Sequence, residues 1–207
     1  MHLKCIIFDF DGTLADTEEH TFRIFNKLAE KHNYKIISSE DLHEIKHLNF
    51  MEILKRIGIP YAKLPKIMKE GQKLLKEDME DIQPFQNDIK DVIDKIHEKV
   101  LIMGVITSNT KKNVVRFLLN YDIKAFDFII SSPLLSKEKK MNAIAKKYHL
   151  NKDEILYVGD EIRDIEACKK AKIKCAAVTW GYNVEETLKR EEPDYIINKL
   201  EDLLHML

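Results

Sequence analysis

Two acidic residues stand two positions apart immediately after a short apolar segment near the N-terminus. Cys5 to Phe8 are apolar, Asp9 and Asp11 follow, and Gly12 comes directly after them. A short run rich in Ile and Phe predicts a buried strand, and glycine lets the chain turn sharply where that strand ends. Two carboxylates at the end of a buried strand are costly unless a cation or a reaction uses them. The pair therefore predicts an active site.

Polar residues also follow three later apolar segments. In chain order these residues are Thr107, Ser108 and Asn109 after the second segment, Lys137 after the third, and Gly159, Asp160, Glu161, Arg163 and Asp164 after the fourth. The carboxyl ends of parallel strands lie at one edge of a sheet, which is where open α/β proteins bind their ligands. We therefore expect these side chains to converge with the first acidic pair.

The residue types in this set predict phosphoryl transfer. Asp9 and Asp160 supply the hard oxygen ligands that suit Mg²⁺, which binds through few protein ligands plus water and phosphate. Lys137 and the metal would neutralise charge on the transferring group, and the Thr107 hydroxyl would donate to a phosphoryl oxygen. One carboxylate can act as nucleophile while the other performs acid and base work.

These residues must be positioned by strands and helices that alternate along the chain. The apolar segments that predict strands are CIIFDF, VLIMGVIT, FDFIIS, ILYVGD, KCAAVT and DYII. Amphipathic segments rich in Lys and Glu predict helices at 88–99, 111–121, 138–149 and 162–172. Such alternation predicts an α/β fold with a doubly wound (Rossmann-like) parallel sheet.

One interval breaks this alternation. Residues 17–83 contain only helical patterns, at 19–33, 40–47, 51–57 and 66–81, although a crossover needs only about a dozen residues. We expect an inserted all-α helical cap domain over 17–83 and a core domain made of 1–16 and 84–207. Pro84 marks the return to the sheet, because proline disfavours a helix at the residue before it.

Composition narrows the class of protein. The chain has 207 residues, 44% hydrophobic and 33% charged, and a net charge of −1, which gives no reason to expect nucleic acid or a membrane surface as partner. Its three cysteines, Cys5, Cys168 and Cys175, show no CxxC spacing and are expected to be buried free thiols. We find no membrane-spanning stretch and no signal-peptide pattern, so we expect a cytoplasmic protein.

Four features in order, FDFDGT, VITSN, Lys137 and YVGDEIRD, resemble the haloacid dehalogenase-like phosphohydrolase superfamily. The helical insert looks like the cap of its phosphoglycolate phosphatase-like branch, and the resemblance covers essentially the whole chain. It implies Mg²⁺-dependent hydrolysis of a small phosphomonoester, a small phosphorylated metabolite, through an aspartyl-phosphate intermediate. We expect a monomer or a homodimer.

The resemblance also implies roles for the acidic residues. Asp9 would be the nucleophile and a metal ligand. Asp11 would protonate the leaving alcohol and then activate water, with its backbone carbonyl on the metal. Asp160 would complete the Mg²⁺ shell, and Asp164 would support Lys137 or a metal-bound water.

For the phosphoryl group, the resemblance implies that Thr107 and Lys137 hold it, while Ser108 and Asn109 shape the loop beside it. Two other lysines of the KEKK run compete for the lysine role, and the spacing to GDEIRD favours Lys137. The residue before it, often glycine in relatives, is Ser136.

Other functions within the same architecture stay open. A sugar phosphomutase uses the same core residues, and a phosphonatase would add a cap lysine that forms a Schiff base. A haloacid dehalogenase does not need Asp11. A non-catalytic phospho-accepting or scaffold protein is the alternative from another class, although a receiver domain has no cap insert and a scaffold would be expected to have lost part of the catalytic set.

Three short patterns have alternative interpretations. HEIKH, at 43–47, matches the HExxH pattern of zinc proteases but has no third ligand at a characteristic spacing. DFDGTL lacks the further ligands of a calcium-binding EF-hand loop. The loop Trp180-Gly181-Tyr182 follows the fifth strand; either this loop would border the catalytic entrance, or Trp180 would pack beneath a helix.

Overall fold

The computed structural model describes residues 3–133 and 136–207. Its centre is a parallel sheet of six strands in the order β3-β2-β1-β4-β5-β6. The strands are β1 (Cys5–Phe8), β2 (Ile102–Thr107), β3 (Phe128–Ser131), β4 (Ile155–Gly159), β5 (Lys174–Val178) and β6 (Tyr195–Ile197). The order reverses direction beside β1, so the predicted doubly wound α/β fold is confirmed.

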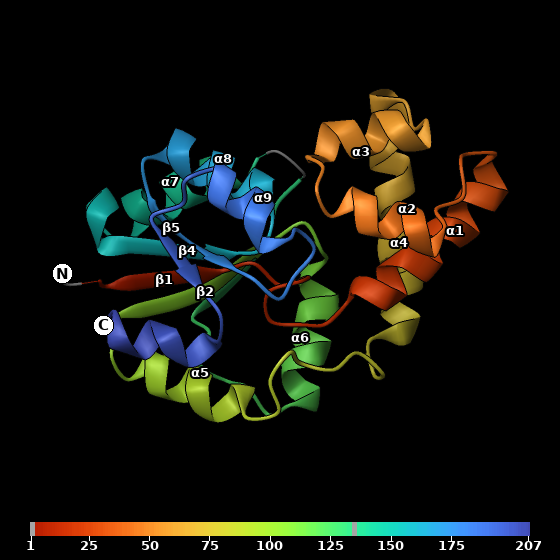
Figure 1. Ribbon diagram of the computed structural model, residues 1–207. Coiled ribbons are helices and arrows are strands. Elements are labelled where there is room, and N and C mark those ends of the chain that lie inside the picture. Colours follow the sequence, from red (N-terminus) through yellow and green to blue (C-terminus); the bar gives the residue numbers. More distant parts are fainter. Residues whose placement is uncertain (1–2, 134–135) are drawn as a thin grey trace.

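Helices cover both faces of this sheet (Figure 1). They are α5 (Ile89–His97), α6 (Lys111–Asn120), α7 (Lys137–Lys147), α8 (Ile162–Ala171) and α9 (Glu185–Arg190), with short 3₁₀ turns η2 (Lys152–Glu154) and η3 (Leu200–His205). Helices α5 and α6 lie on one side of the sheet, and α7, α8 and α9 lie on the other.

The central strand β1 shows why the sheet needs two layers of helices. All four of its residues are buried. Ile6 and Phe8 belong to the apolar cluster that includes Phe117 of α6, whereas Cys5 and Ile7 belong to the cluster that includes Met141 of α7. Successive side chains of a strand point to opposite faces, so a strand that is apolar at every position must be covered on both.

The chain between β1 and α5 forms a separate group of helices, on the right of Figure 1. They are α1 (Glu18–His32), α2 (Ser39–Ile45), α3 (Phe50–Ile57) and α4 (Leu64–Asp78), with the 3₁₀ turn η1 (Tyr61–Lys63). Ser38 and Asn49 accept hydrogen bonds from the first turns of α2 and α3, and Gly58 ends α3 with a φ of 76°. These local signals explain why this segment breaks into short helices.

The two ends of this helical segment lie side by side. Ala15 forms an isolated antiparallel bridge with Pro84, and the Asp16 N–H donates to the Gln83 carbonyl at 2.8 Å. The predicted division into a cap of 17–83 and a core of 1–16 and 84–207 stays a prediction, and this geometry is compatible with it. The three cysteines are buried free thiols, as expected. None of the described helices is long and apolar enough to cross a membrane.

Candidate active site

Asp9 lies at the carboxyl end of β1, and both of its carboxylate oxygens have a donor. Its side chain is 2% exposed. Oδ1 accepts from the Phe10 N–H at 2.7 Å, and Oδ2 accepts from Lys137 Nζ at 2.5 Å. Its own N–H continues the sheet by donating to the Val158 carbonyl at 2.8 Å. The carboxylate is therefore held in one orientation at the end of the central strand.

Lys137 is the first residue of α7 and connects two acids. Nζ donates to Asp9 and, at 2.6 Å, to Asp164 Oδ1, and the side chain is 5% exposed. Burial alone would lower the pKa of Lys137, but the carboxylates of Asp164 and Asp9 outweigh it and raise this pKa. The lysine is thus held in its charged form. Lys139, by contrast, is exposed.

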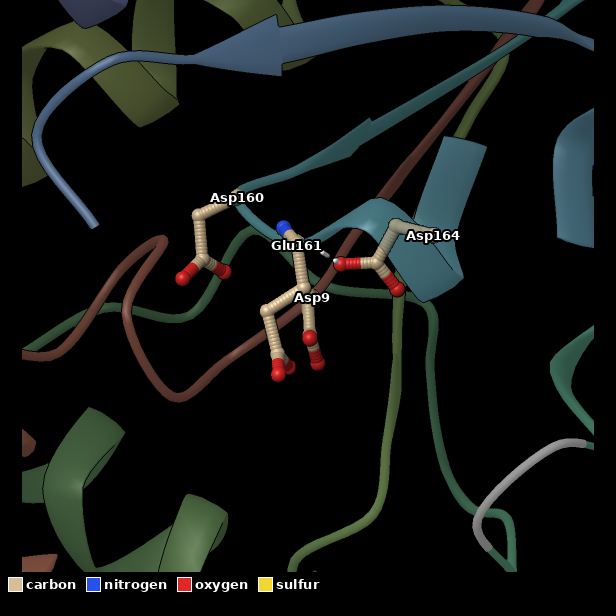
Figure 2. Close-up of side chains that lie close together, drawn as sticks. All are labelled: Asp9, Asp160, Glu161 and Asp164. Carbon is tan, nitrogen blue, oxygen red and sulfur yellow. Dashed lines mark hydrogen bonds between the residues drawn. The ribbon is translucent and has the colours of Figure 1, made fainter. Parts of the chain in front are cut away.

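Four carboxylates from two strand ends lie close together (Figure 2). One oxygen from each of four side chains lies within 4.8 Å of the others, and the four are Asp9, Asp160, Glu161 and Asp164. Asp160 is fully buried and is fixed by the Thr13 hydroxyl and the Tyr182 N–H, both at 2.8 Å. The Glu161 N–H donates to Asp164 Oδ2.

Without a bound cation, ionisation of the carboxyl groups in this cluster is unfavourable. Burial, partly offset by Lys137, raises the pKa of Asp9 to about 7. Burial, together with the charges of Glu161 and Asp9, raises the pKa of Asp160 well above its ordinary value. A divalent cation would favour the ionised forms, and grouped carboxylate oxygens are the ligands that Mg²⁺ prefers. The residues present therefore fit the predicted magnesium ion.

Asp11 points into a different hydrogen-bond network. The Asn109 amide donates to Asp11 Oδ1 at 2.9 Å, and Asn113 donates to Asn109 Oδ1 at 2.9 Å. Burial raises the pKa of Asp11, and the hydrogen bonds from Asn109 and Thr17 oppose this effect. The two acids of the DFD segment thus have separate surroundings.

The loop after β2 is ordered around Thr107. This residue is fully buried, and its Oγ1 accepts from the Asn109 N–H at 2.9 Å. The Ser108 carbonyl accepts from the Gln72 side chain of α4, which ties the loop to the helical insert. The structure thus brings Asp9, Lys137, Asp160 and Asp164 together and places Asp11, Thr107, Ser108 and Asn109 in a second group beside them. Their catalytic and binding roles stay predictions, as does the backbone carbonyl of Asp11 as a metal ligand.

Sequence reasoning assigned no role to several residues that the structure places here. Glu161 joins the acidic cluster, and Arg163 forms an ion pair with it. The Arg163 guanidinium also lies 5.5 Å from the centre of the Phe50 ring of α3. The only sequence signal for either residue was its position inside the GDEIRD motif.

The segment after β5 also connects to the helical insert. The Tyr182 hydroxyl lies 2.8 Å from the Thr17 hydroxyl and 3.1 Å from that of Thr21. Asn183 donates to the carbonyls of Lys46 and Leu48, at 2.9 and 3.2 Å. These contacts hold the insert against the edge of the sheet.

Trp180 lies beside residues that flank the two ends of the helical insert. Its Nε1 donates to the Thr13 carbonyl at 3.1 Å, and its ring centre lies 6.5 Å from that of Phe85. Trp180 therefore packs on the loop after β1, the loop that carries Asp9 and Asp11.

The HEIKH segment does not form a metal centre in the described part of the chain. The rings of His43 and His47 lie 5.6 Å apart, and His47 Nδ1 is 3.5 Å from the Thr187 hydroxyl. Among residues 3–133 and 136–207, the acidic cluster is the only group of three or more His, Cys, Asp or Glu side chains close enough to share an ion.

The sequence model of the haloacid dehalogenase-like hydrolase family matches residues 6–178. The chain belongs to this family. The predicted superfamily is thereby confirmed, and the match runs from β1 to the end of β5, so it includes the helical insert and every residue of the acidic cluster.

Individual relatives agree with this membership. A phosphoglycolate phosphatase of Synechococcus elongatus is 28% identical over 204 residues, 98% of this chain and 96% of the relative. A pyrophosphatase PpaX of Listeria innocua is 25% identical over 208 residues, 98% of this chain and 95% of the relative. These matches confirm the phosphoglycolate phosphatase-like branch and the predicted enzyme class of haloacid dehalogenase-like phosphatase.

A solved structure shares the fold. A haloacid dehalogenase-like hydrolase from Streptococcus pneumoniae superposes with a TM-score of 0.76 at 19% identity, and the match covers 99% of this chain and 98% of that one. At this identity the likeness shows the architecture alone.

Proposed function

We propose that this protein hydrolyses a small phosphomonoester, with Asp9 as the nucleophile. The observation that carries the proposal is the contrast between two acids two residues apart. Asp9 is fixed by the Phe10 N–H and Lys137 inside the acidic cluster, whereas Asp11 is bound to Asn109 in a separate network. Paired carboxyl groups in different surroundings can take different chemical roles.

In the first step a carboxylate oxygen of Asp9 attacks phosphorus. A phosphorus–oxygen bond forms to Asp9, the bond from phosphorus to the alcohol oxygen breaks, and Asp11 gives its proton to that departing oxygen. The raised pKa of Asp11, caused by burial, favours the protonated form that this step needs. The products of this step are the free alcohol and an aspartyl phosphate on Asp9.

In the second step water replaces Asp9 on phosphorus. Asp11, now a carboxylate, accepts a proton from the water, the water oxygen bonds to phosphorus, and the bond to Asp9 breaks, which releases inorganic phosphate. The Thr107 Oγ1 already accepts from the Asn109 N–H, so its own proton is available for a phosphoryl oxygen. Lys137 supplies positive charge beside the nucleophile.

The carboxylates of the acidic cluster would bind the metal ion. Asp9 and Asp160 would hold Mg²⁺, with Glu161 and Asp164 adjoining. Such an ion, when bound, neutralises charge on the transferring phosphoryl group. Relatives that are named phosphoglycolate phosphatase and pyrophosphatase support the choice of a phosphorylated substrate.

Helices α1 to α4 would act as a cap over this edge. The contacts of Gln72 with Ser108 and of Asn183 with Lys46 and Leu48 support a closed arrangement, in which water is excluded from the reacting atoms. We propose 17–83 as this cap and 1–16 with 84–207 as the catalytic core.

The test is release of inorganic phosphate from an aryl phosphate, with Mg²⁺ and with the metal chelated. We expect Mg²⁺-dependent release that falls by at least about 10³-fold in Asp9→Asn. Asp16→Asn is the matched control, since Asp16 is an exposed acid of the same loop. Activity that persists in Asp9→Asn, or that is unchanged when the metal is chelated, would contradict the proposal. Formation of an isomeric sugar phosphate without net phosphate release would favour a phosphomutase.

A further inference from the structure

A cavity leads from the catalytic edge into the helical insert. Its volume is about 290 Å³, which is close to the lower end for small-molecule sites. At the sheet edge it is lined by Asp11, Ser108 and Asn109. Within the insert its wall is mainly apolar, and half-buried members of that wall include Phe22, Phe25, Phe50, Ile53 and Met68.

The acids at the mouth of the cavity show which part of a substrate it would receive. Asp11 lines the cavity, whereas Asp9, Thr107 and Lys137 are absent from its lining. In the proposed reaction Asp11 protonates the alcohol oxygen and Asp9 bonds to phosphorus. The cavity therefore lies on the side of the alcohol that leaves, and its lining selects that alcohol.

Both cations in the described lining of the cavity are already paired with acids of the same lining. Lys46 Nζ lies 2.7 Å from Glu18 Oε1 and donates to Oε2 at 2.8 Å, and both side chains are 27% exposed. Arg163 forms an ion pair with Glu161, and these side chains are 12% and 14% exposed. With Asp11 as a further acid, the lining carries no surplus of positive charge.

We infer that the natural substrate is a phosphomonoester whose alcohol is uncharged and largely apolar, such as a small aryl or alkyl group. This inference rests on the proposed function and specifies its substrate class. A carboxylate or a second phosphate on the alcohol would enter an apolar wall without a free cation, and burying such an unpaired charge is unfavourable. An apolar group gains from burial against the same wall.

Binding of phosphonates tests the inference without turnover. Benzylphosphonate and 3-phosphonopropionate imitate an apolar ester and a carboxylate-bearing ester, and neither has a phosphate ester bond to hydrolyse. Calorimetry in the presence of Mg²⁺ should show benzylphosphonate bound at least about 10-fold more tightly. Equal affinity, or tighter binding of 3-phosphonopropionate, would overturn the inference whether or not the protein is a phosphatase.

Turnover separates failure of the inference from failure of the proposed function. Phenyl phosphate should show a kcat/KM at least about 10-fold above that of phosphoglycolate or pyrophosphate. Preference for phosphoglycolate or pyrophosphate would overturn the substrate class and leave the proposed hydrolysis intact. No hydrolysis of any of the three would refute the proposed function, and the phosphonate affinities would then decide the inference alone.

Two variants test the lining itself. Glu18→Gln removes the partner of Lys46, so the affinity ratio should shift by about 10-fold toward 3-phosphonopropionate. Glu19→Gln, at an exposed neighbouring acid, should leave this ratio unchanged. Phe22→Ala should weaken benzylphosphonate by about 10-fold and methylphosphonate little, because only the first has a ring to bury. An unchanged ratio in Glu18→Gln together with equal losses in Phe22→Ala would refute this use of the cavity.

Discussion

Lys137 Nζ lies 2.5 Å from Asp9 Oδ2, although the two residues are 128 positions apart in the sequence. The sheet explains this contact, because β1 ends and α7 begins at its carboxyl edge. Asp164 lies on the other side of the same ammonium group, at 2.6 Å. One buried lysine thus forms ion pairs with two buried acids, and the orientation of the proposed nucleophile depends on it.

Replacement of this lysine by an apolar side chain should cost both stability and activity. Lys137→Met leaves Asp9 and Asp164 buried without their shared cation, so we expect a loss of about 3–5 kcal/mol in the free energy of unfolding. Phosphatase activity should fall by at least about 10²-fold. Urea denaturation and kcat/KM for an aryl phosphate measure the two effects.

The run KEKK contains a matched control for this variant. Lys139→Met changes an exposed lysine two positions away. It should alter stability by less than about 0.5 kcal/mol and leave activity near that of the parent. Equal losses in Lys139→Met would mean that the wrong lysine has been assigned.

Replacement of Gly12, beside the acidic cluster, should disturb the cluster as well as strain the backbone. Gly12 has a φ of 78°, and a Cβ at this position would collide with the Asp160 carboxylate. Gly58 has nearly the same φ, 76°, but a Cβ there meets no atom within 4 Å. Alanine at either position should cost about 1–2 kcal/mol of backbone strain.

Activity should distinguish these two glycines. Gly12→Ala must displace Asp160, so kcat/KM should fall by about 10²-fold, whereas Gly58→Ala should keep the activity of the parent. The measurement is kcat/KM for an aryl phosphate at a temperature where both variants are folded. Equal activities would show that the position of Asp160 does not matter for the reaction.

Removal of the amide that contacts Asp11 should shift the pH profile. The Asn109 hydrogen bond lowers the pKa of Asp11, so its loss in Asn109→Ala should raise that pKa. If protonated Asp11 donates to the departing alcohol, the alkaline limb of kcat/KM should move to higher pH, by about one unit. The rate itself should fall about 10-fold because the acid is less well oriented. A lower rate with an unmoved limb would indicate a purely structural role for Asn109.

The metal should stabilise the protein more at alkaline than at acidic pH. Burial raises the pKa of Asp9 to about 7 in the metal-free protein, above its value in the unfolded chain. The metal-free fold should therefore lose stability as pH rises between the ordinary aspartate pKa and about 7, because in this range the folded state keeps a proton that the unfolded state has already lost. Mg²⁺ binds the ionised carboxylates and removes this penalty.

A pair of thermal melts measures this effect. The rise in Tm on adding Mg²⁺ should be larger at about pH 8 than at about pH 5.5, and Asp160→Asn should reduce the rise at the higher pH. Asp16→Asn should leave it unchanged. A Tm shift that is the same at both pH values would contradict ionisation of the cluster on metal binding.

The sequence allowed the strand ends to be placed but not the contacts made across the molecule. Apolar runs that end in Asp9, Thr107 and Asp160 predict one shared edge, because parallel strands align their carboxyl ends. The same pattern could not show that Asp11 points toward Asn109 and is not a member of the acidic cluster. That orientation depends on the loop around Gly12, which has no periodic signal.

The lining of the cap was beyond sequence reasoning for a different reason. Helical patterns predict helices at 19–33 and 51–57, but they cannot state whether the apolar faces of these helices pack completely or border a cavity. Likewise, Lys46 was one of several basic residues of the insert. Its pairing with Glu18 follows from how α1 and α2 are placed, which local pattern does not determine.

The most direct measurement is to find the phosphoryl group on Asp9. Asp11→Asn should keep the nucleophile but lose both the acid of the first step and the base of the second. An aryl phosphate, whose phenolate leaves without protonation, should still phosphorylate Asp9, so the variant mixed with Mg²⁺ should accumulate phosphoenzyme. Acid quenching and peptide mass spectrometry should then place one phosphoryl group on the peptide that contains Asp9, and none in Asp9→Asn. Phosphate release by the parent, with no phosphoryl group on that peptide under any quench condition, would contradict Asp9 as the nucleophile.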